Sequence, residues 1–390
     1  MNSPPFNIVL SAGEPSGDLI AAQVAAELKK IEPRCRLFGM GGPRLAETGC
    51  DVVTPMPAVM GLGGPVAGAG HIAASIARLV RAAVSRKVAA AILVDFPDFH
   101  LALARMLHMA GIPVFQFVSP QIWAWRPGRI KTIKRYVTKT FLIFPFEQAI
   151  YDKAGIPARF VGHPIVDRMR RLPSKTAARK TLGIAPGRPV IALLPGSRAA
   201  VLKRHLPAFG AAARAVSERV HGMTFICSIM PGIDERFYRS AFSLQPSAFS
   251  LVLSRADGPV ILRAADAAII SSGTGALEAV LAATPFCGVY VTSPFTYNIV
   301  KRMAGVERIL MVNILAGRDV VREFVQYEAR PEAIAGEVAS LIRDSGRRRA
   351  MRSDFREVRK MLGPGGAAAR VAKEVVGFCT CKERDARGAG

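Results

Sequence analysis

The chain has 390 residues, of which 50% are hydrophobic, so it exceeds one typical domain and suits two domains with large apolar cores. Its formal net charge of +24 favours anionic partners such as nucleic acid, anionic lipid or phosphorylated substrates, without choosing among them. Its six cysteines have no zinc-like spacing and fit a reducing compartment, and no run approaches the roughly 18 apolar residues of a membrane-spanning helix.

The N-terminal sequence MNSPPFNIVLSAGEPSGD has no basic start, and its apolar run has only the length of a strand. We therefore expect no signal peptide and a cytoplasmic protein. Such a protein can still lie on a membrane surface.

Short apolar runs alternate with helical periodicity along the first half, which is typical of a parallel sheet wound by right-handed crossovers. The expected strands are Phe6–Ser11, Leu37–Met40, Ala89–Val94, Val114–Val118 and Thr140–Phe144. Helices are expected between them, among them Gly17–Lys30, His71–Arg86 and Phe99–Met109.

The pattern pauses over Arg168–Arg188, which is rich in Arg, Lys and Pro, and then restarts. The next expected strands are Val190–Leu194, Thr224–Ile229, Ala267–Ser271 and Phe286–Tyr290. We predict an α/β protein with two Rossmann-like parallel-sheet domains, over residues 1–170 and 171–345. Residues 346–390 are expected to hold C-terminal helices and a disordered tail.

The first candidate loop is SAGEPSGD, residues Ser11–Asp18, directly after the first expected strand. Gly13 and Gly17 permit tight turns and the close approach of a substrate. A polar residue of the loop could equally cap the next helix. Glu14 has no evident structural task, so the loop predicts a substrate contact there.

The second loop, LVDFPDFH, carries two aspartates. Asp95 closes an apolar strand, and ligands of open parallel sheets bind at the carboxyl ends of strands. Asp98 lies in the first turn of the next expected helix, where its charge favours the helix dipole. Asp95 is therefore the better candidate for a general base.

The third loop, LLPGSRAAVLKRHLP, places Gly196, Ser197 and Arg198 between an expected strand and a helix. It lacks the GK[ST] sequence of a phosphate loop. Backbone N–H groups and an arginine at a helix N-terminus still make an anion site. The alternative is an ordinary strand-to-helix turn.

The fourth loop, AAIISSGTGALEAVLAATP, runs from a buried strand through Ser272, Gly273 and Thr274 into a helix. Its small residues allow a phosphate close to the helix N-terminus. Glu278 lies one turn beyond Thr274 on the same helix face and could accept hydrogen bonds from ribose hydroxyls. The combination predicts a nucleotide diphosphate bound without a metal.

The fifth segment, VNILAGRDVVREFVQ, has Asn313 and Arg318 on either side of a glycine-containing turn. Both could line a ligand site, or Asn313 could cap a helix while Arg318 stays solvated. The histidines are isolated, and no paired Cys/His spacing supports a metal site. We therefore expect neither a metal nor a cofactor.

These motifs together resemble the lipid-A-disaccharide synthase family over most of the chain. Further stretches that carry the resemblance are GMGGPRLAETGC, VMGL, DFPDF, VSPQIWAWR, IFPFE, VGHP, SPFTYNIVKRM and NILAGRDVV. The resemblance implies a GT-B glycosyltransferase, with two Rossmann-like domains facing across a cleft. The C-terminal domain would hold the sugar nucleotide and the N-terminal domain the acceptor.

The implied reaction is inverting and joins UDP-2,3-diacylglucosamine to 2,3-diacylglucosamine 1-phosphate. It would give the β-1,6-linked lipid A disaccharide 1-phosphate and UDP. By motif, Asp95 matches the family's base, residues Gly196–Arg198 and Ser272–Glu278 match its nucleotide-binding region, and Asn313 and Arg318 match its N-x-x-A-G-R segment. One departure is Val201, where many relatives carry an acidic residue.

Both tryptophans of the chain lie in VSPQIWAWRPGRIKTIKRY, beside a basic cluster. Since the implied substrates are acylated, Trp123 and Trp125 would suit a membrane interface. Arg126 and Arg129 would suit anionic lipid or the substrate phosphate. Peripheral binding to the inner membrane is therefore expected; the alternative is core packing of the tryptophans and a solvated basic helix.

Two rival functions share some of these features. Other GT-B enzymes, such as the transferase that adds N-acetylglucosamine to the peptidoglycan lipid or a UDP-sugar 2-epimerase, do not account for DFPDF and WAWR. Nucleic-acid binding would use the basic charge, but the basic residues are scattered and no RNA-recognition or helix-turn-helix sequence is present. We therefore expect no nucleic-acid partner, and a homodimer stays open.

Overall fold

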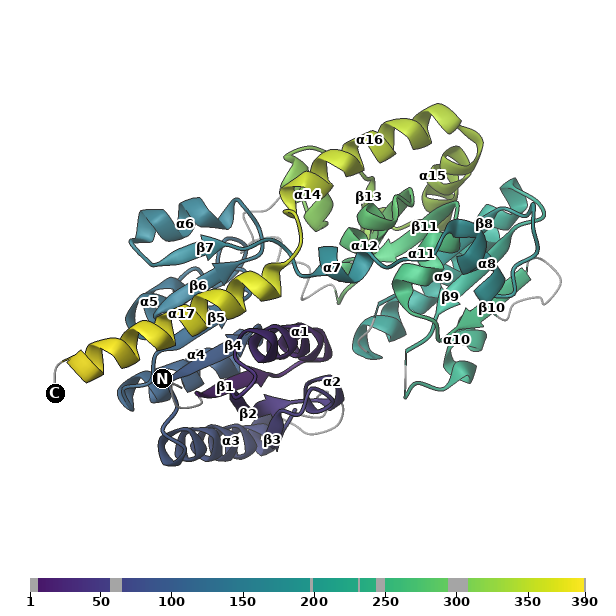
Figure 1. The fold of residues 1–390 in the computed structure, drawn as a ribbon. Coiled ribbons are helices and arrows are strands. Elements are labelled where there is room, and N and C mark those ends of the chain that lie inside the picture. Colours follow the sequence, from purple (N-terminus) through teal and green to yellow (C-terminus); the bar gives the residue numbers. More distant parts are fainter. Residues whose placement is uncertain are drawn as a thin grey trace. The chain divides into compact units, whose positions relative to one another are not determined.

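The computed structural model describes residues 6–56, 65–196, 199–230, 232–242, 250–293 and 308–388. The chain forms two compact α/β units (Figure 1). Unit 1 comprises Met1–Pro164 together with Leu362–Gly390, and unit 2 comprises Ile165–Met361. No helix among the described residues is both long enough and apolar enough to cross a bilayer.

Unit 1 is built on a parallel sheet of seven strands in the order β3-β2-β1-β4-β5-β6-β7. The strands are β1 (Asn7–Ala12), β2 (Arg36–Gly41), β3 (Asp51–Pro55), β4 (Ala90–Val94), β5 (Val114–Phe117), β6 (Lys139–Leu142) and β7 (Ala158–Phe160). Every residue of the AAILV strand β4 is buried, as expected for a parallel sheet covered on both faces.

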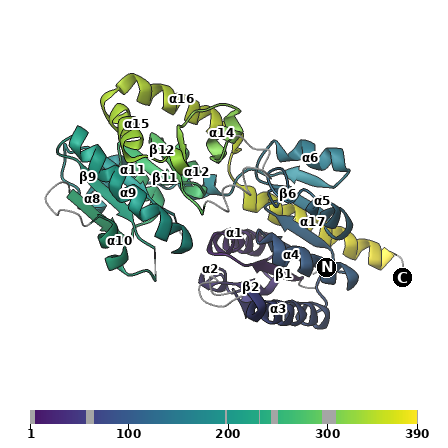
Figure 2. The same ribbon diagram turned by 180° about the vertical axis from the view of Figure 1, so that it is seen from behind.

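The helices of unit 1 are α1 (Pro15–Ile31), α2 (Pro43–Ala46), α3 (Pro65–Ser85), α4 (Pro97–Met109), α5 (Arg129–Tyr136), α6 (Glu147–Ala154) and α17 (Ala367–Gly388). One core joins the sheet to α3, α4 and α5, through buried side chains such as Leu79, Leu103 and Ile133. Helices α1 and α17 pack against each other, as the views from both sides show (Figure 2).

The C-terminal segment differs from the sequence prediction. The expected disordered tail is the helix α17, and the helix belongs to unit 1 although it follows unit 2 in sequence. Its Val371, Val375 and Cys379 recur every four residues and are buried, so one apolar stripe anchors it. Glu374 pairs with Lys139 and, at 3.2 Å, with Arg159.

Unit 2 repeats the architecture with six parallel strands in the order β10-β9-β8-β11-β12-β13. The strands are β8 (Val190–Leu194), β9 (Thr224–Ser228), β10 (Ser250–Ser254), β11 (Ala267–Ser271), β12 (Phe286–Tyr290) and β13 (Glu323–Val325). The division between the units falls after Pro164, ahead of the boundary expected at residue 170.

The described helices of unit 2 are α7 (Ile165–Met169), α8 (Lys175–Thr181), α9 (Ala199–Arg219), α10 (Glu235–Phe242), α11 (Gly258–Ala264), α12 (Thr274–Ala282), α14 (Met311–Ala316), α15 (Pro331–Arg343) and α16 (Ser345–Met361), with a 3₁₀ turn at Gln326–Glu328. Helix α16 therefore belongs to unit 2, so the C-terminal segment 346–390 is divided between the two units.

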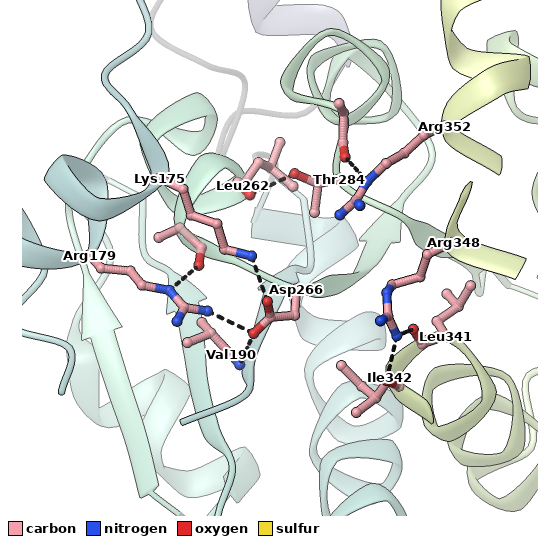
Figure 3. A network of polar contacts seen from close by, with 12 residues as sticks. Lys175, Arg179, Val190, Leu262, Asp266, Thr284, Leu341, Ile342, Arg348 and Arg352 are labelled. Atoms are coloured by element: carbon pink, nitrogen blue, oxygen red, sulfur yellow. Dashed lines mark hydrogen bonds and ion pairs between the residues drawn. The ribbon is translucent and has the colours of Figure 1, made fainter. Parts of the chain in front are cut away.

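A network of polar contacts ties the helices of unit 2 to its sheet (Figure 3). Asp266 accepts hydrogen bonds from Lys175 at 2.5 Å, Arg179 at 2.7 Å and the Val190 amide at 2.8 Å. Burial alone would raise the pKa of Asp266, but these partners hold it below its usual value. Arg348 and Arg352 donate to backbone carbonyls. Part of the basic charge is thus used to hold the fold.

Both sheets have the Rossmann strand order. Successive strands are added on one side of the first strand and then on its other side, and the point of change is the switch point. In unit 1 the switch point lies between β1 and β4, and in unit 2 between β8 and β11. Ligands of such sheets bind outside the carboxyl ends of those strands. Four of the predicted loops follow these four strands, so two pairs of motifs come together at two switch points.

Candidate active site

At the switch point of unit 1, the chain after β4 takes an uncommon backbone conformation. Asp95 and Phe96 both have positive φ, at 54° and 50°, in the left-handed region that side chains disfavour. The Asp95 amide donates to the Phe117 carbonyl at 2.9 Å, and the Asp95 side chain is half-buried at the strand end. Such strain is found at many functional sites, and the role of Asp95 as the base stays a prediction.

The loop after β1 makes room for this turn. A Cβ on Gly13 would lie 2.1 Å from the Phe96 ring, so only glycine fits beneath it. The Phe96 ring also stacks on Phe99 with centroids 5.7 Å apart. SAGEPSGD and DFPDFH are therefore two halves of one packed structure.

Sequence reasoning missed a third member of this site, His100. Its ring is buried, with Nδ1 2.6 Å from the Asp95 carbonyl oxygen and Nε2 2.9 Å from Ser11 Oγ. A carbonyl only accepts, so Nδ1 carries the hydrogen and Nε2 accepts from the Ser11 hydroxyl. Burial lowers the pKa of His100 to about 4, against the opposing bond to Asp95, and keeps the ring neutral.

Of the two acidic residues in the first loop, Asp18 has a structural role. Asp18 is buried and accepts hydrogen bonds from the amides of Gly42, Arg44 and Leu45, so it caps the short helix α2. Glu14 occupies the N-cap position of α1 and is half-buried. Its assignment to the acceptor side stays a prediction.

Asp98 lies near Arg126 and Arg129, the two arginines predicted to contact anionic lipid or the substrate phosphate. Its exposed carboxylate forms an ion pair with Arg126 at 3.0 Å and a second, shorter one with Arg129. The charge of Asp98 thus joins the N-terminus of α4 to the start of α5 and the residues just before it. These three residues form one charged group, in which Asp98 already has two basic partners.

The two tryptophans have different environments. Trp125 is 41% exposed, and the Arg126 guanidinium lies over its ring at 4.7 Å. Trp123 instead packs edge-to-face on Phe146 with centroids 5.2 Å apart, and its Nε1 is buried with no hydrogen-bond partner among the described residues. Trp125 is therefore open to solvent, whereas Trp123 is half-buried against Phe146, and a membrane role for either stays a prediction.

At the switch point of unit 2, β8 and β11 lead into the two glycine loops. Gly196 has φ of 116°, and a Cβ there would lie 3.0 Å from Val201 and 3.4 Å from Ser271 Oγ. Val201 thus packs on the loop. Ser197 and Arg198 lie outside the described residues, as do VMGL and most of SPFTYNIVKRM.

The second glycine loop begins α12 with an open turn. Gly273 has φ of 147° and, like Thr274, is exposed, while Ser272 is half-buried. A Cβ on Gly275 would already touch Ile270 and Leu194, so the start of the helix packs closely on the sheet. The amides of this helix start suit an anion, as the sequence predicts.

Glu278 lies one turn into α12 and has a protein partner that the sequence did not indicate. Its Oε1 is 2.8 Å from Arg168 of α7, and the residue is only 8% exposed. Burial raises the pKa of Glu278 although the charge of Arg168 opposes the shift. A structural explanation for Glu278 therefore exists, and its contact with ribose stays a prediction.

Asn313 has a structural role, which the sequence had left open beside a ligand contact. Its side chain is buried, donates to the Val321 carbonyl and Glu323, and accepts from the amides of Val320 and Val321. All its hydrogen-bonding capacity is used to hold the turn after α14. Arg318 pairs with Asp354 and Glu357 of α16, each at 2.9 Å. Contact of either residue with a ligand stays a prediction.

His205 of α9 was also missed. Its Nδ1 donates to the Pro195 carbonyl at 2.9 Å, and its Nε2 accepts from the Val291 amide at 3.0 Å. The buried ring therefore joins the loop after β8 to the end of β12. The second partner of each histidine, Ser11 for His100 and Val291 for His205, lies far away in the chain, so the local sequence does not indicate either link.

Comparison with known proteins decides which family this site belongs to. The family model described as Lipid-A-disaccharide synthetase matches residues 8–370. The chain belongs to the lipid-A-disaccharide synthase family. A lipid-A-disaccharide synthase of Anaeromyxobacter sp. (strain K) is 41% identical over 375 residues, which cover 95% of this chain and 97% of the relative. That of Myxococcus xanthus (strain DK1622) is 40% identical over 378 residues, covering 96% and 98%.

Solved structures establish the fold class. A UDP-glucosyltransferase from Polygonum tinctorium superposes with a TM-score of 0.64 at 14% identity, covering 97% of this chain and 99% of its own. The UDP-GlcNAc 2-epimerase of Neisseria meningitidis, bound to UDP-GlcNAc, gives 0.66 at 11% identity, with 95% and 99% covered. The GT-B prediction is confirmed. Membership in the lipid-A-disaccharide synthase family makes the chain a glycosyltransferase of lipid A biosynthesis rather than an epimerase.

Proposed function

We propose that the chain joins UDP-2,3-diacylglucosamine to 2,3-diacylglucosamine 1-phosphate and releases the β-1,6-linked disaccharide 1-phosphate and UDP. The observation that carries the assignment of sites is the pairing of motifs at two Rossmann switch points. Unit 1 presents a carboxylate, Asp95, on a strained turn. Unit 2 presents two glycine loops at helix starts, which suit a diphosphate.

In the proposed reaction Asp95 is the general base. Its carboxylate takes the proton of the acceptor 6-hydroxyl as that oxygen bonds to C1 of the donor sugar. The bond between C1 and the diphosphate oxygen breaks, and UDP leaves with the electron pair. One displacement of this kind inverts the configuration at C1.

The departing diphosphate needs stabilisation of its negative charge. The amides at the start of α12 and the loop around Gly196 would supply it, together with Ser197 and Arg198, which follow Gly196 in the sequence. Ser272, Gly273, Thr274 and Glu278 complete the proposed nucleotide site. Turnover without a metal ion stays part of the proposal, and equal rates with EDTA and with Mg²⁺ would support it.

We also propose that the chain works in the cytoplasm, bound peripherally to the inner membrane. Exposed Trp125 lies beside Arg126 and is followed by the basic helix α5, whose sequence RIKTIKRY carries most of the cluster. An aromatic side chain with neighbouring basic residues suits an anionic lipid surface. The Arg126–Arg129 pair is the candidate contact for a lipid or acceptor phosphate.

The direct test is an assay of purified protein with both acylated glucosamines. Disaccharide 1-phosphate and UDP should appear in equal amounts by mass spectrometry. UDP release without disaccharide would indicate hydrolysis and contradict the proposed transfer. Release that requires no acceptor would do the same.

A further inference from the structure

His100 links the two motif loops of unit 1 through both of its ring nitrogens. The Nδ1–H donates to the carbonyl of Asp95, and Nε2 accepts from the hydroxyl of Ser11. The ring is 1% exposed and Ser11 is fully buried, so water does not replace either bond. A single neutral imidazole therefore joins the end of β1 to the residue that follows β4.

The bond to Asp95 acts on a strained part of the backbone. Two consecutive residues with positive φ are costly for side chains, and such a turn persists only when its surroundings hold it. The Phe96 ring contacts His100 edge-on, with centroids 5.9 Å apart. The imidazole thus holds the turn through the Asp95 carbonyl, and the absence of a side chain at Gly13 leaves room for the Phe96 ring.

We propose that His100 is a positioning residue for Asp95: it fixes the Asp95 peptide, and thereby the direction of the carboxylate, without touching the substrate. This inference rests on the proposed role of Asp95 as the base. A base must lie within hydrogen-bond reach of the proton that it removes, so a relaxed turn would lower kcat. Donor binding, which belongs to unit 2 in the proposed function, would be unaffected.

Two substitutions separate the two bonds of the ring. The amide nitrogen of Asn can occupy the place of Nδ1, so His100→Asn retains the donor to Asp95. The end of a Gln side chain reaches the place of Nε2, so His100→Gln retains only the contact with Ser11. We expect His100→Gln to lower kcat by roughly tenfold to a hundredfold, as for a misplaced catalytic group, with donor KM unchanged. His100→Asn should retain most of kcat.

A double-mutant cycle with Asp95→Asn distinguishes positioning from support of the fold. If His100 acts through Asp95, adding His100→Gln to the Asp95→Asn variant does not lower kcat any further. Three results would overturn the inference. The losses of kcat from His100→Gln and Asp95→Asn could be additive, His100→Asn and His100→Gln could lower kcat equally, or His100→Gln could keep full activity. An active Asp95→Asn enzyme would instead refute the proposed base, whatever the His100 variants do.

Ser11→Ala provides a second route should the His100 variants fail to fold. It leaves the imidazole in place and removes one of its two anchors. A several-fold fall in kcat that disappears in the Asp95→Asn background supports the inference. An unchanged kcat in Ser11→Ala, with no folded His100 variant, overturns it.

Discussion

The Phe96 ring fills the space that any side chain at Gly13 would need, since an added Cβ would lie 2.1 Å from ring atom Cδ1. Gly13 belongs to the first motif of unit 1, and Phe96 follows the proposed base. Gly13→Ala should therefore displace the turn, lowering stability by about 1–3 kcal/mol and kcat along with it. Gly377→Ala, where an added Cβ meets nothing, is the matched control. Normal melting temperature and kcat in Gly13→Ala would refute the packing argument.

The two aspartates of DFPDF should respond differently to loss of charge. Asp95→Asn keeps the shape and removes the proton acceptor, so kcat should fall by roughly 10²–10⁴-fold while melting temperature holds. Asp98→Asn breaks exposed ion pairs with Arg126 and Arg129, which are worth about 1 kcal/mol or less, and should cost little rate. Both are to be assayed at saturating substrates. An inactive, folded Asp98→Asn beside an active Asp95→Asn would reverse the assignment.

Glu278 and Arg168 form one ion pair but should differ in function. If Glu278 also contacts ribose, Glu278→Ala raises the donor KM by roughly tenfold, the effect of losing a charged hydrogen bond. Arg168→Gln retains a donor to Glu278 and should leave the donor KM nearly unchanged. Steady-state kinetics with varied donor measures both. Equal increases in the two variants would mean that the pair only supports the fold.

Trp125 and Trp123 provide a matched pair for membrane binding. The wild-type chain should bind anionic vesicles and be partly released by salt, because each basic residue near the surface contributes about 1 kcal/mol that salt screens. Trp125→Ala should reduce the fraction that stays bound at high salt, measured by co-sedimentation. Trp123→Ala should lower the melting temperature instead, because this ring packs on Phe146. Wild-type binding by Trp125→Ala would argue against an interfacial role.

Glu147 should make stability depend on pH. Burial raises its pKa to about 7, although the Phe144 amide donates to it at 3.1 Å and opposes the shift. The folded state therefore binds a proton that the unfolded state has released, so this residue's contribution to stability falls as pH rises from about 4.5 to about 7.

Glu147→Gln removes that dependence. Relative to wild type, the variant should gain stability between pH 5 and pH 8, by at most about 3 kcal/mol. Urea denaturation at the two pH values measures the change. A constant difference between variant and wild type would show that Glu147 does not titrate in this range.

The sequence by itself determined the interior strands of both sheets, because each is a short, mostly apolar run between turn residues. It did not indicate β3, β7, β10 and β13, which are the four edge strands. These strands are partly exposed, so at most three apolar residues follow one another in each. The sequence also placed Asp95, Gly196 and Gly273 at strand ends, since each closely follows such a run.

Only the tertiary structure decided the partners of these residues. His100 reaches Ser11 across 89 positions of sequence, Arg168 reaches Glu278 across 110, and Glu374 brings α17 back to unit 1 across more than 200. Periodicity reports which face of an element is buried but not what lies against that face. For the same reason the sequence left two roles open for Asn313, and only the structure shows that its side chain holds the turn that follows it.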